Sequence, residues 1–234
     1  MSQHLAVRHR FRRLSVLLCI LTFLLTSFHY SANALDFYVL SGYHLTDGIT
    51  NVTFHYSNPV GYSSNYNVNY LSDILLSANS WVSKIRSYTG ERISVTYSSS
   101  DSSDIRYIFI NSTVSPYDSN LAGCIFYNAN GTAVPTAGDA DLYPSPAANY
   151  TYVEIILNQA NVKNISSSAD FRLLSAHEKG HAFGLRHMIQ INYSNWDSVS
   201  DCQSIMYEYT QTIYADHGIS APTATDCRGV IAAN

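Results

Sequence analysis

The sequence predicts a single α+β domain with about five strands, two long helices and a C-terminal helix. Short segments that alternate polar and apolar residues recur along the chain, as expected for strands. Two longer segments repeat apolar residues at helical spacing. No internal repeat is apparent, and after the N-terminal region no second apolar run approaches the length of a membrane span.

Residues 1–34 are predicted to be a secretory signal peptide. Four arginines between Arg8 and Arg13 precede the apolar run 14–28, and Ala32-Asn33-Ala34 resembles a cleavage site. The run is shorter than the roughly 20 residues of a membrane helix, although an uncleaved anchor is the alternative. Residues 35–234 are then expected to form one exported domain, either extracellular or periplasmic.

The charge of this exported part argues against polyanionic partners. Removing the four N-terminal arginines from the thirteen basic residues leaves nine, against seventeen acidic residues, so the formal net charge is −8. We therefore expect no nucleic acid and, after signal cleavage, no membrane among the partners.

The predicted elements follow in order along the mature chain. Apolar residues between Leu71 and Ile85 form one helical stripe, which Thr89-Gly90 ends. Serines 166–168 offer caps for a helix that continues through a group of histidines, and Pro222 begins a last helix that reaches Ala233. Residues 128–150 are rich in Pro, Gly, Ala and Asn and predict a long loop. The predicted strands are 51–57, 92–97, 104–110, 121–127 and 152–157.

Residues 177–187 spell His-Glu-Lys-Gly-His-Ala-Phe-Gly-Leu-Arg-His. On a helix, His177 and His181 leave the same face about one turn apart, a spacing that suits two ligands of one zinc ion. Glu178 lies beside the first ligand, where its carboxylate can reach a zinc-bound water. Gly184 can adopt the left-handed conformation that ends a helix, so that His187 returns as a third ligand. Three protein ligands leave one position of zinc open, as in catalytic sites.

With this motif, the chain resembles the metzincin metalloproteases, most closely the matrixin group and its bacterial relatives. The resemblance implies a metzincin-like zincin fold with a mixed, twisted sheet. It implies His177, His181 and His187 as zinc ligands, Glu178 as general base, and Met206 as the methionine of a tight turn beneath the zinc. The other segments that carry it are Ser204-Ile205-Met206-Tyr207, Leu174-Ser175-Ala176, Asp104-Ile105 and Gly138-Asp139-Ala140-Asp141.

The chain also departs from the matrixin pattern. The predicted mature start at Leu35 leaves no room for an inhibitory propeptide. Matrixins carry a second, structural zinc with its own histidines, but Asp141 stands where one of these would be expected, so we predict one zinc. Asp139 and Asp141 are candidate calcium ligands, with simple solvation as the alternative.

Three cysteines remain after signal cleavage. Export makes one disulfide plausible, and we expect Cys202 to pair with Cys227, leaving Cys124 free or paired between chains. For Cys124, a small buried thiol is the plainer interpretation, and a regulatory thiolate on zinc is the alternative.

Together, these observations predict that the protein is a monomeric, secreted zinc endopeptidase that acts on protein or peptide substrates. Glu178 would take a proton from the zinc-bound water and pass it to the leaving amine. An extended substrate would pair with the edge strand near 121–127. Two alternatives are an exported binding protein without turnover and a metal-dependent hydrolase of another bond.

Overall fold

The structure is a computed structural model, and it describes residues 43–57, 64–111, 122–135, 146–187, 204–206 and 219–234. The chain divides into two units, residues 1–38 and 39–234, and every described residue belongs to the second.

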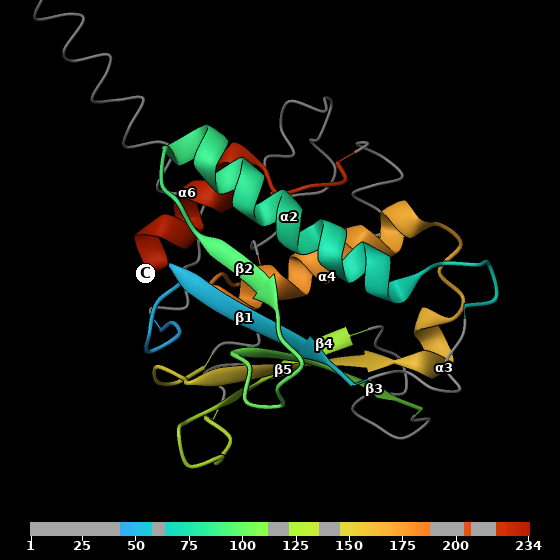
Figure 1. Cartoon of the computed structure of the whole chain (residues 1–234), viewed down its shortest axis with the longest axis horizontal. Helices are drawn as coiled ribbons and strands as arrows, with labels where there is room; N and C mark the ends of the chain where they lie inside the picture. Colours follow the sequence, from blue (N-terminus) through green and yellow to red (C-terminus); the bar gives the residue numbers. More distant parts are fainter. Residues whose placement is uncertain (1–42, 58–63, 112–121, 136–145, 188–203, 207–218) are drawn as a thin grey trace, which may run out of the picture. The chain divides into compact units, whose positions relative to one another are not determined.

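The described residues form an α+β fold, in which a mixed sheet is accompanied by helices (Figure 1). This confirms the predicted fold class. In chain order, the elements are β1 (Asn51–Tyr56), α2 (Tyr70–Thr89), β2 (Ser94–Tyr97), β3 (Ile105–Ile110), β4 (Ala122–Tyr127), β5 (Tyr152–Asn158), α3 (Gln159–Val162), α4 (Ser168–Ala182) and α6 (Ala224–Ala233).

The five strands of the described region form one sheet in the order β2-β1-β3-β5-β4. The first four strands in this order run parallel, whereas β4 pairs antiparallel with β5. Strand β4 therefore lies at one edge of the sheet. Its register places Cys124 opposite Ile155 and Phe126 opposite Val153, so these side chains share a face.

Local capping explains where the two long helices begin and end. Asn69 Oδ1 accepts a hydrogen bond from the Ser72 amide at the start of α2. Gly90 ends α2 at a φ of +80°, a conformation that glycine adopts without strain. Helix α4 begins after Ser167, whose Oγ accepts from the Asp170 amide. The sequence predicted the caps at Gly90 and within serines 166–168, and both are present, whereas the cap at Asn69 was not predicted.

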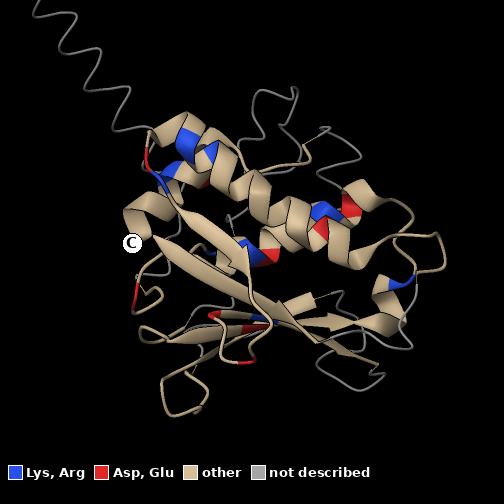
Figure 2. Ribbon diagram, in the orientation of Figure 1, with Lys and Arg blue, Asp and Glu red and all other residues tan. Residues whose placement is uncertain are grey.

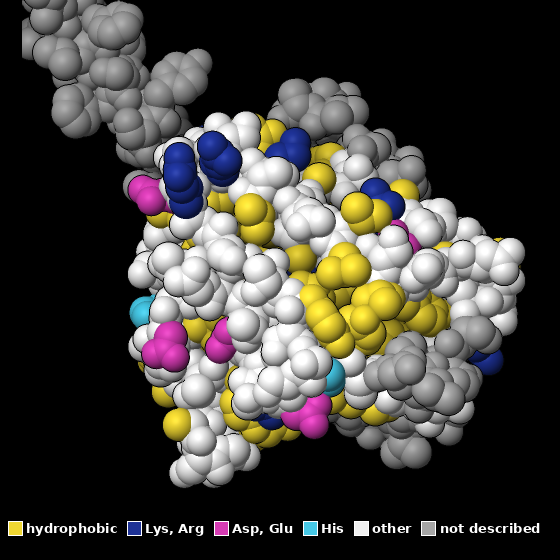
Figure 3. Space-filling model, viewed as in Figure 1, with side chains coloured by type: hydrophobic (Ala, Val, Ile, Leu, Met, Phe, Trp, Pro, Cys, Tyr) yellow, Lys and Arg dark blue, Asp and Glu magenta, His cyan; other side chains and the backbone are white. Residues whose placement is uncertain are grey.

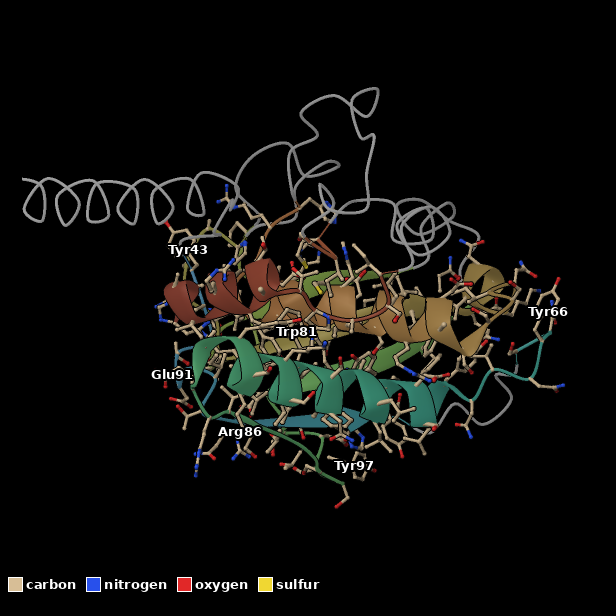
Figure 4. The ribbon with its side chains drawn as sticks, turned by 90° about the horizontal axis from the view of Figure 1, so that it is seen from above. Tyr43, Tyr66, Trp81, Arg86, Glu91 and Tyr97 are labelled. Atoms are coloured by element: carbon tan, nitrogen blue, oxygen red, sulfur yellow. The ribbon has the colours of Figure 1, made fainter. Side chains whose placement is uncertain are left out.

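The helices lie on one side of the sheet, and the core lies between (Figure 1). Strand β3 shows the alternation that this arrangement requires, because Ile105, Tyr107 and Phe109 are buried and the residues between them are partly exposed. Trp81 is fully buried on α2, and its Nε1 donates to the Ala176 carbonyl of α4 at 2.9 Å (Figure 4).

An ion pair joins the same two helices. Arg172 on α4 donates to Asp73 Oδ1 in the first turn of α2, through Nε at 3.3 Å and Nη2 at 3.0 Å. The Asp73 side chain is only 3 % exposed, whereas that of Arg172 is 36 % exposed. The carboxylate is therefore the partner that depends on the contact for its burial.

Charged residues are sparse across the described elements, and neutral polar and hydrophobic side chains make up most of the face in view (Figures 2 and 3). Within the described ranges, no helix combines the length and the apolar character needed to cross a bilayer.

We predict that Arg172→Ala lowers the free energy of unfolding by roughly 2 kcal/mol, because it leaves the buried Asp73 carboxylate without its cation. We expect a smaller loss of unfolding free energy than for a fully buried ion pair, because Arg172 is partly exposed. Urea denaturation of the mature protein measures it. Arg86→Ala removes an exposed arginine from the last turn of α2 and should cost no more than about 0.5 kcal/mol. Equal losses in the two variants would contradict the assignment.

Candidate metal centre

The three predicted histidine ligands converge at the C-terminal end of α4. The distance from His177 Nε2 is 3.0 Å to His187 Nε2 and 3.1 Å to His181 Nε2. One nitrogen from each ring lies within 4.8 Å of the other two. Among the described residues, these three histidines form the group of His, Cys, Asp or Glu side chains that could hold a metal ion. His177 and His181 are buried and His187 is partly buried.

Backbone carbonyl groups orient two of these rings. His177 Nδ1 lies 2.7 Å from the Ile205 carbonyl oxygen, and His181 Nδ1 lies 2.9 Å from that of Leu185. A carbonyl oxygen only accepts, so each Nδ1 carries the proton and donates. Each Nε2 is then left with its lone pair, which is the tautomer that a metal requires.

Burial keeps both rings neutral. It lowers the pKa of His177 to about 3, with a further contribution from the neighbouring His187. It also lowers the pKa of His181 well below its usual range, and His187 and His177 add to this effect. Neutral imidazole is the form that binds metals.

The chemistry of this group fits a divalent cation. Two neutral rings with protonated Nδ1 atoms present unprotonated Nε2 atoms to each other at 3.1 Å, so no hydrogen bond can join them. The two lone pairs repel each other, whereas a cation bound between the two nitrogens would attract both of them. Imidazole nitrogens about 2.0–2.1 Å from zinc at tetrahedral angles lie a little over 3 Å apart, close to the observed separations.

The end of helix α4 places the third histidine. Gly184 has a φ of +93°, as the sequence predicted. Its amide donates to the His181 carbonyl, and the Leu185 amide donates to that of Gly180, a Schellman pair of hydrogen bonds. The same turn brings the Leu185 carbonyl to the His181 ring and returns the chain so that His187 reaches the group.

A second segment, Ser204–Met206, lies against the histidines and is held by α6. Asp226 Oδ2 accepts from the Ile205 amide at 3.1 Å, and Oδ1 accepts from the Ser204 hydroxyl group. The same carboxylate completes the capping box of α6 with Thr223. Asp226 thus fixes the residue whose carbonyl orients His177.

Met206 packs beneath the helix at Gly180. A Cβ added to Gly180 would lie well inside contact distance of Met206 Sδ, and 3.4 Å from Trp81 Cζ2. Met206 is 2 % exposed. The structure therefore places the predicted methionine under the histidine helix, where only a glycine allows so close an approach.

Glu178 faces the edge strand β4. Its side chain is 5 % exposed, and burial raises its pKa to about 7, an effect that a hydrogen bond from Cys124 opposes. Cys124 Sγ lies 3.3 Å from Glu178 Oε2. A carboxyl group with such a pKa can both take and release a proton near neutral pH.

Lys179 lies behind the histidines in a polar cluster that the sequence analysis did not predict. Its Nζ lies 2.6 Å from both Ser77 Oγ and Tyr107 Oη, 3.1 Å from the Ile74 carbonyl oxygen and 3.2 Å from Ser175 Oγ. Burial lowers the pKa of Lys179 well below its usual range. The cluster joins α2, β3 and α4 directly behind the ligands.

Several predicted residues lie elsewhere. The candidate calcium ligands Asp139 and Asp141 fall outside the described residues, as does Cys202. Cys227 is fully buried on α6, and because its predicted partner Cys202 lies outside the described residues, the disulfide between them stays a prediction. The structure leaves Cys124 free.

Sequence reasoning missed Asp226 and Lys179. A Thr-x-x-Asp spacing ahead of the last helix is a capping-box signal and could have identified Asp226. For Lys179, the signal was a lysine on the buried face of a helix, flanked at four residues by Ser175.

No protein-family model matches the chain, and no curated protein matches it in a sequence comparison. The resemblance drawn from the sequence therefore rests on the histidine motif, which the triad and the neighbouring Glu178 fit.

We predict that Gly180→Ala weakens binding of added Zn²⁺ at least tenfold, because the new methyl group displaces Met206 and tilts the ligand helix. Competition with a chromophoric chelator measures the Kd. Met206→Ala in the same chain should restore part of the affinity. Gly123→Ala is the control, since a Cβ there meets no atom within 4 Å. An unchanged Kd in Gly180→Ala would refute this account of the glycine.

Proposed function

We propose that this protein is a secreted, zinc-dependent endopeptidase of the metzincin type, most similar to the matrixins. The observation that carries the proposal is the convergence of three imidazole nitrogens next to a buried carboxylic acid. Three imidazole nitrogens that leave room for a further ligand, with an acid beside them, are the composition of catalytic zinc sites.

His177, His181 and His187 would hold the zinc. When bound, zinc supplies Lewis-acid chemistry, because it lowers the pKa of water to about 7 and polarises a carbonyl group. Glu178 moves the proton in this proposal. Its carboxylate takes a proton from the attacking water and delivers it to the amine that leaves when the peptide bond breaks.

The sheet offers a place for an extended substrate. Among the described strands, β4 pairs with β5 alone. Residues 133–134 occupy part of its other side: Ala133 forms a β-bridge with Tyr127, and the Val134 amide donates a hydrogen bond to the Phe126 carbonyl at 2.7 Å. Within the described region, no strand covers the outer side of residues 122–125. A peptide could add to this segment through backbone hydrogen bonds, close to Glu178.

The remaining expectations form part of the same proposal. The protein would act as a monomer outside the cytoplasm on protein or peptide substrates, without nucleic acid or membrane as partners. One catalytic zinc would suffice, and any calcium would bind at Asp139 and Asp141.

An exported binding protein without turnover is the competing function. The intact Glu178 favours catalysis, because a binding protein needs no buried acid beside the histidines.

The first test is an assay of the purified mature protein on casein or gelatin. We expect cleavage that 1,10-phenanthroline abolishes and that added Zn²⁺ restores, because the ion supplies the Lewis acid. Full Zn²⁺ loading without cleavage of these proteins or of a peptide library would instead support the binding protein.

The second test separates the roles of acid and ligands. Glu178→Ala should retain one Zn²⁺ per chain but lose at least about 100-fold in kcat, the scale of general-base catalysis. His181→Ala should lose the metal, as measured by elemental analysis. Wild-type turnover in Glu178→Ala, or a full zinc in His181→Ala, would contradict the assigned roles.

A further inference from the structure

Cys124 is the side chain of β4 that faces the Glu178 carboxylate. Its Sγ lies 3.3 Å from Glu178 Oε2 and 3.5 Å from the Glu178 carbonyl oxygen. The alternation of β4 accounts for this direction, because Cys124 is paired with the buried Ile155, and Gly123 and Ile125 point to the opposite face.

The direction of this hydrogen bond follows from which of the two groups carries a hydrogen atom. In its ionised form, the Glu178 carboxylate only accepts, so the thiol supplies the hydrogen. Burial and the nearby Glu178 raise the pKa of the Cys124 thiol well above its usual range, so the sulfur keeps its proton. The thiol therefore acts as a neutral donor to Glu178 and has little reactivity of its own.

We propose that Cys124 is a positioning residue that holds the Glu178 carboxylate in a fixed orientation through its S–H···Oε2 hydrogen bond. With Oε2 held, rotation about the last side-chain bond is restricted and the second oxygen points in one direction. This inference rests on the proposed endopeptidase function, in which Glu178 must meet the proton of a water molecule.

The location of the thiol gives this contact a second consequence. Cys124 belongs to the segment 122–125, which we propose as the docking edge for substrate, while Glu178 belongs to α4. One hydrogen bond thus joins the strand that would hold the substrate to the acid that would act on it. A shift of β4 changes the orientation of Glu178 directly.

Two substitutions of Cys124 test this role kinetically. Cys124→Ala removes the donor and is expected to lower kcat about fivefold, the scale of one weak hydrogen bond, with KM and zinc content unchanged. Cys124→Ser keeps a donor of similar size and should remain within about twofold of the wild-type kcat. Thr96→Ala changes an exposed residue of β2, which lies at the opposite edge of the sheet from β4, and should leave kcat unchanged.

A spectroscopic measurement tests the hydrogen bond without turnover. The infrared S–H stretching band of Cys124, obtained as the difference between wild-type and Cys124→Ala spectra, should lie at lower frequency than that of a free thiol. Glu178→Ala should shift this band to higher frequency. The bands of the other cysteines should not move.

The outcomes separate the inference from the function. If the wild-type protein cleaves no peptide, the proposed function fails, and the infrared shift still reports the contact. If it cleaves and Cys124→Ala keeps the full kcat, or if Glu178→Ala leaves the band unmoved, the positioning role of Cys124 is refuted. Loss of kcat in Ala with recovery in Ser supports it.

Discussion

The candidate metal centre depends on two hydrogen bonds from imidazole Nδ1 atoms to backbone carbonyl groups. The Ile205 carbonyl fixes His177 and the Leu185 carbonyl fixes His181, so both rings present unprotonated Nε2 atoms to the same point. Without them, either ring could adopt the other tautomer and offer a proton where a lone pair is needed. Because backbone carbonyl groups accept but never donate, the arrangement does not depend on which side chains happen to be charged.

Each of these carbonyl groups is itself held by a different part of the fold. The Leu185 carbonyl is placed by the Schellman turn at Gly184, which is local to the motif. The Ile205 carbonyl comes from a segment nearly thirty residues further along, and Asp226 on α6 holds that segment in place. The fold as a whole therefore orients His177, and Met206 against Gly180 sets the distance between the segment and the helix.

Polar groups inside the fold tie the supporting layers together behind the ligands. Lys179 bridges α2, β3 and α4 through hydroxyl and carbonyl groups, and Trp81 bonds to the Ala176 carbonyl. Burial of an amine costs free energy, which hydrogen bonds with the surrounding oxygen atoms offset in part. Such a satisfied network favours one relative placement of the elements over others that an apolar core would tolerate.

The sequence by itself identified the three histidines as a group, the helix that carries two of them and the glycine that ends it, because these follow from spacing and backbone conformation within eleven residues. It also predicted the five strands to within two residues at each end, the C-terminal cap of α2 and the N-terminal cap of α4, since alternation and capping are local. It did not reveal the strand order, the role of Asp226, the cluster around Lys179 or the contact of Cys124 with Glu178. Only the tertiary structure decided these, because each joins residues more than twenty positions apart or a side chain to a distant backbone atom, and no local pattern encodes such a pairing.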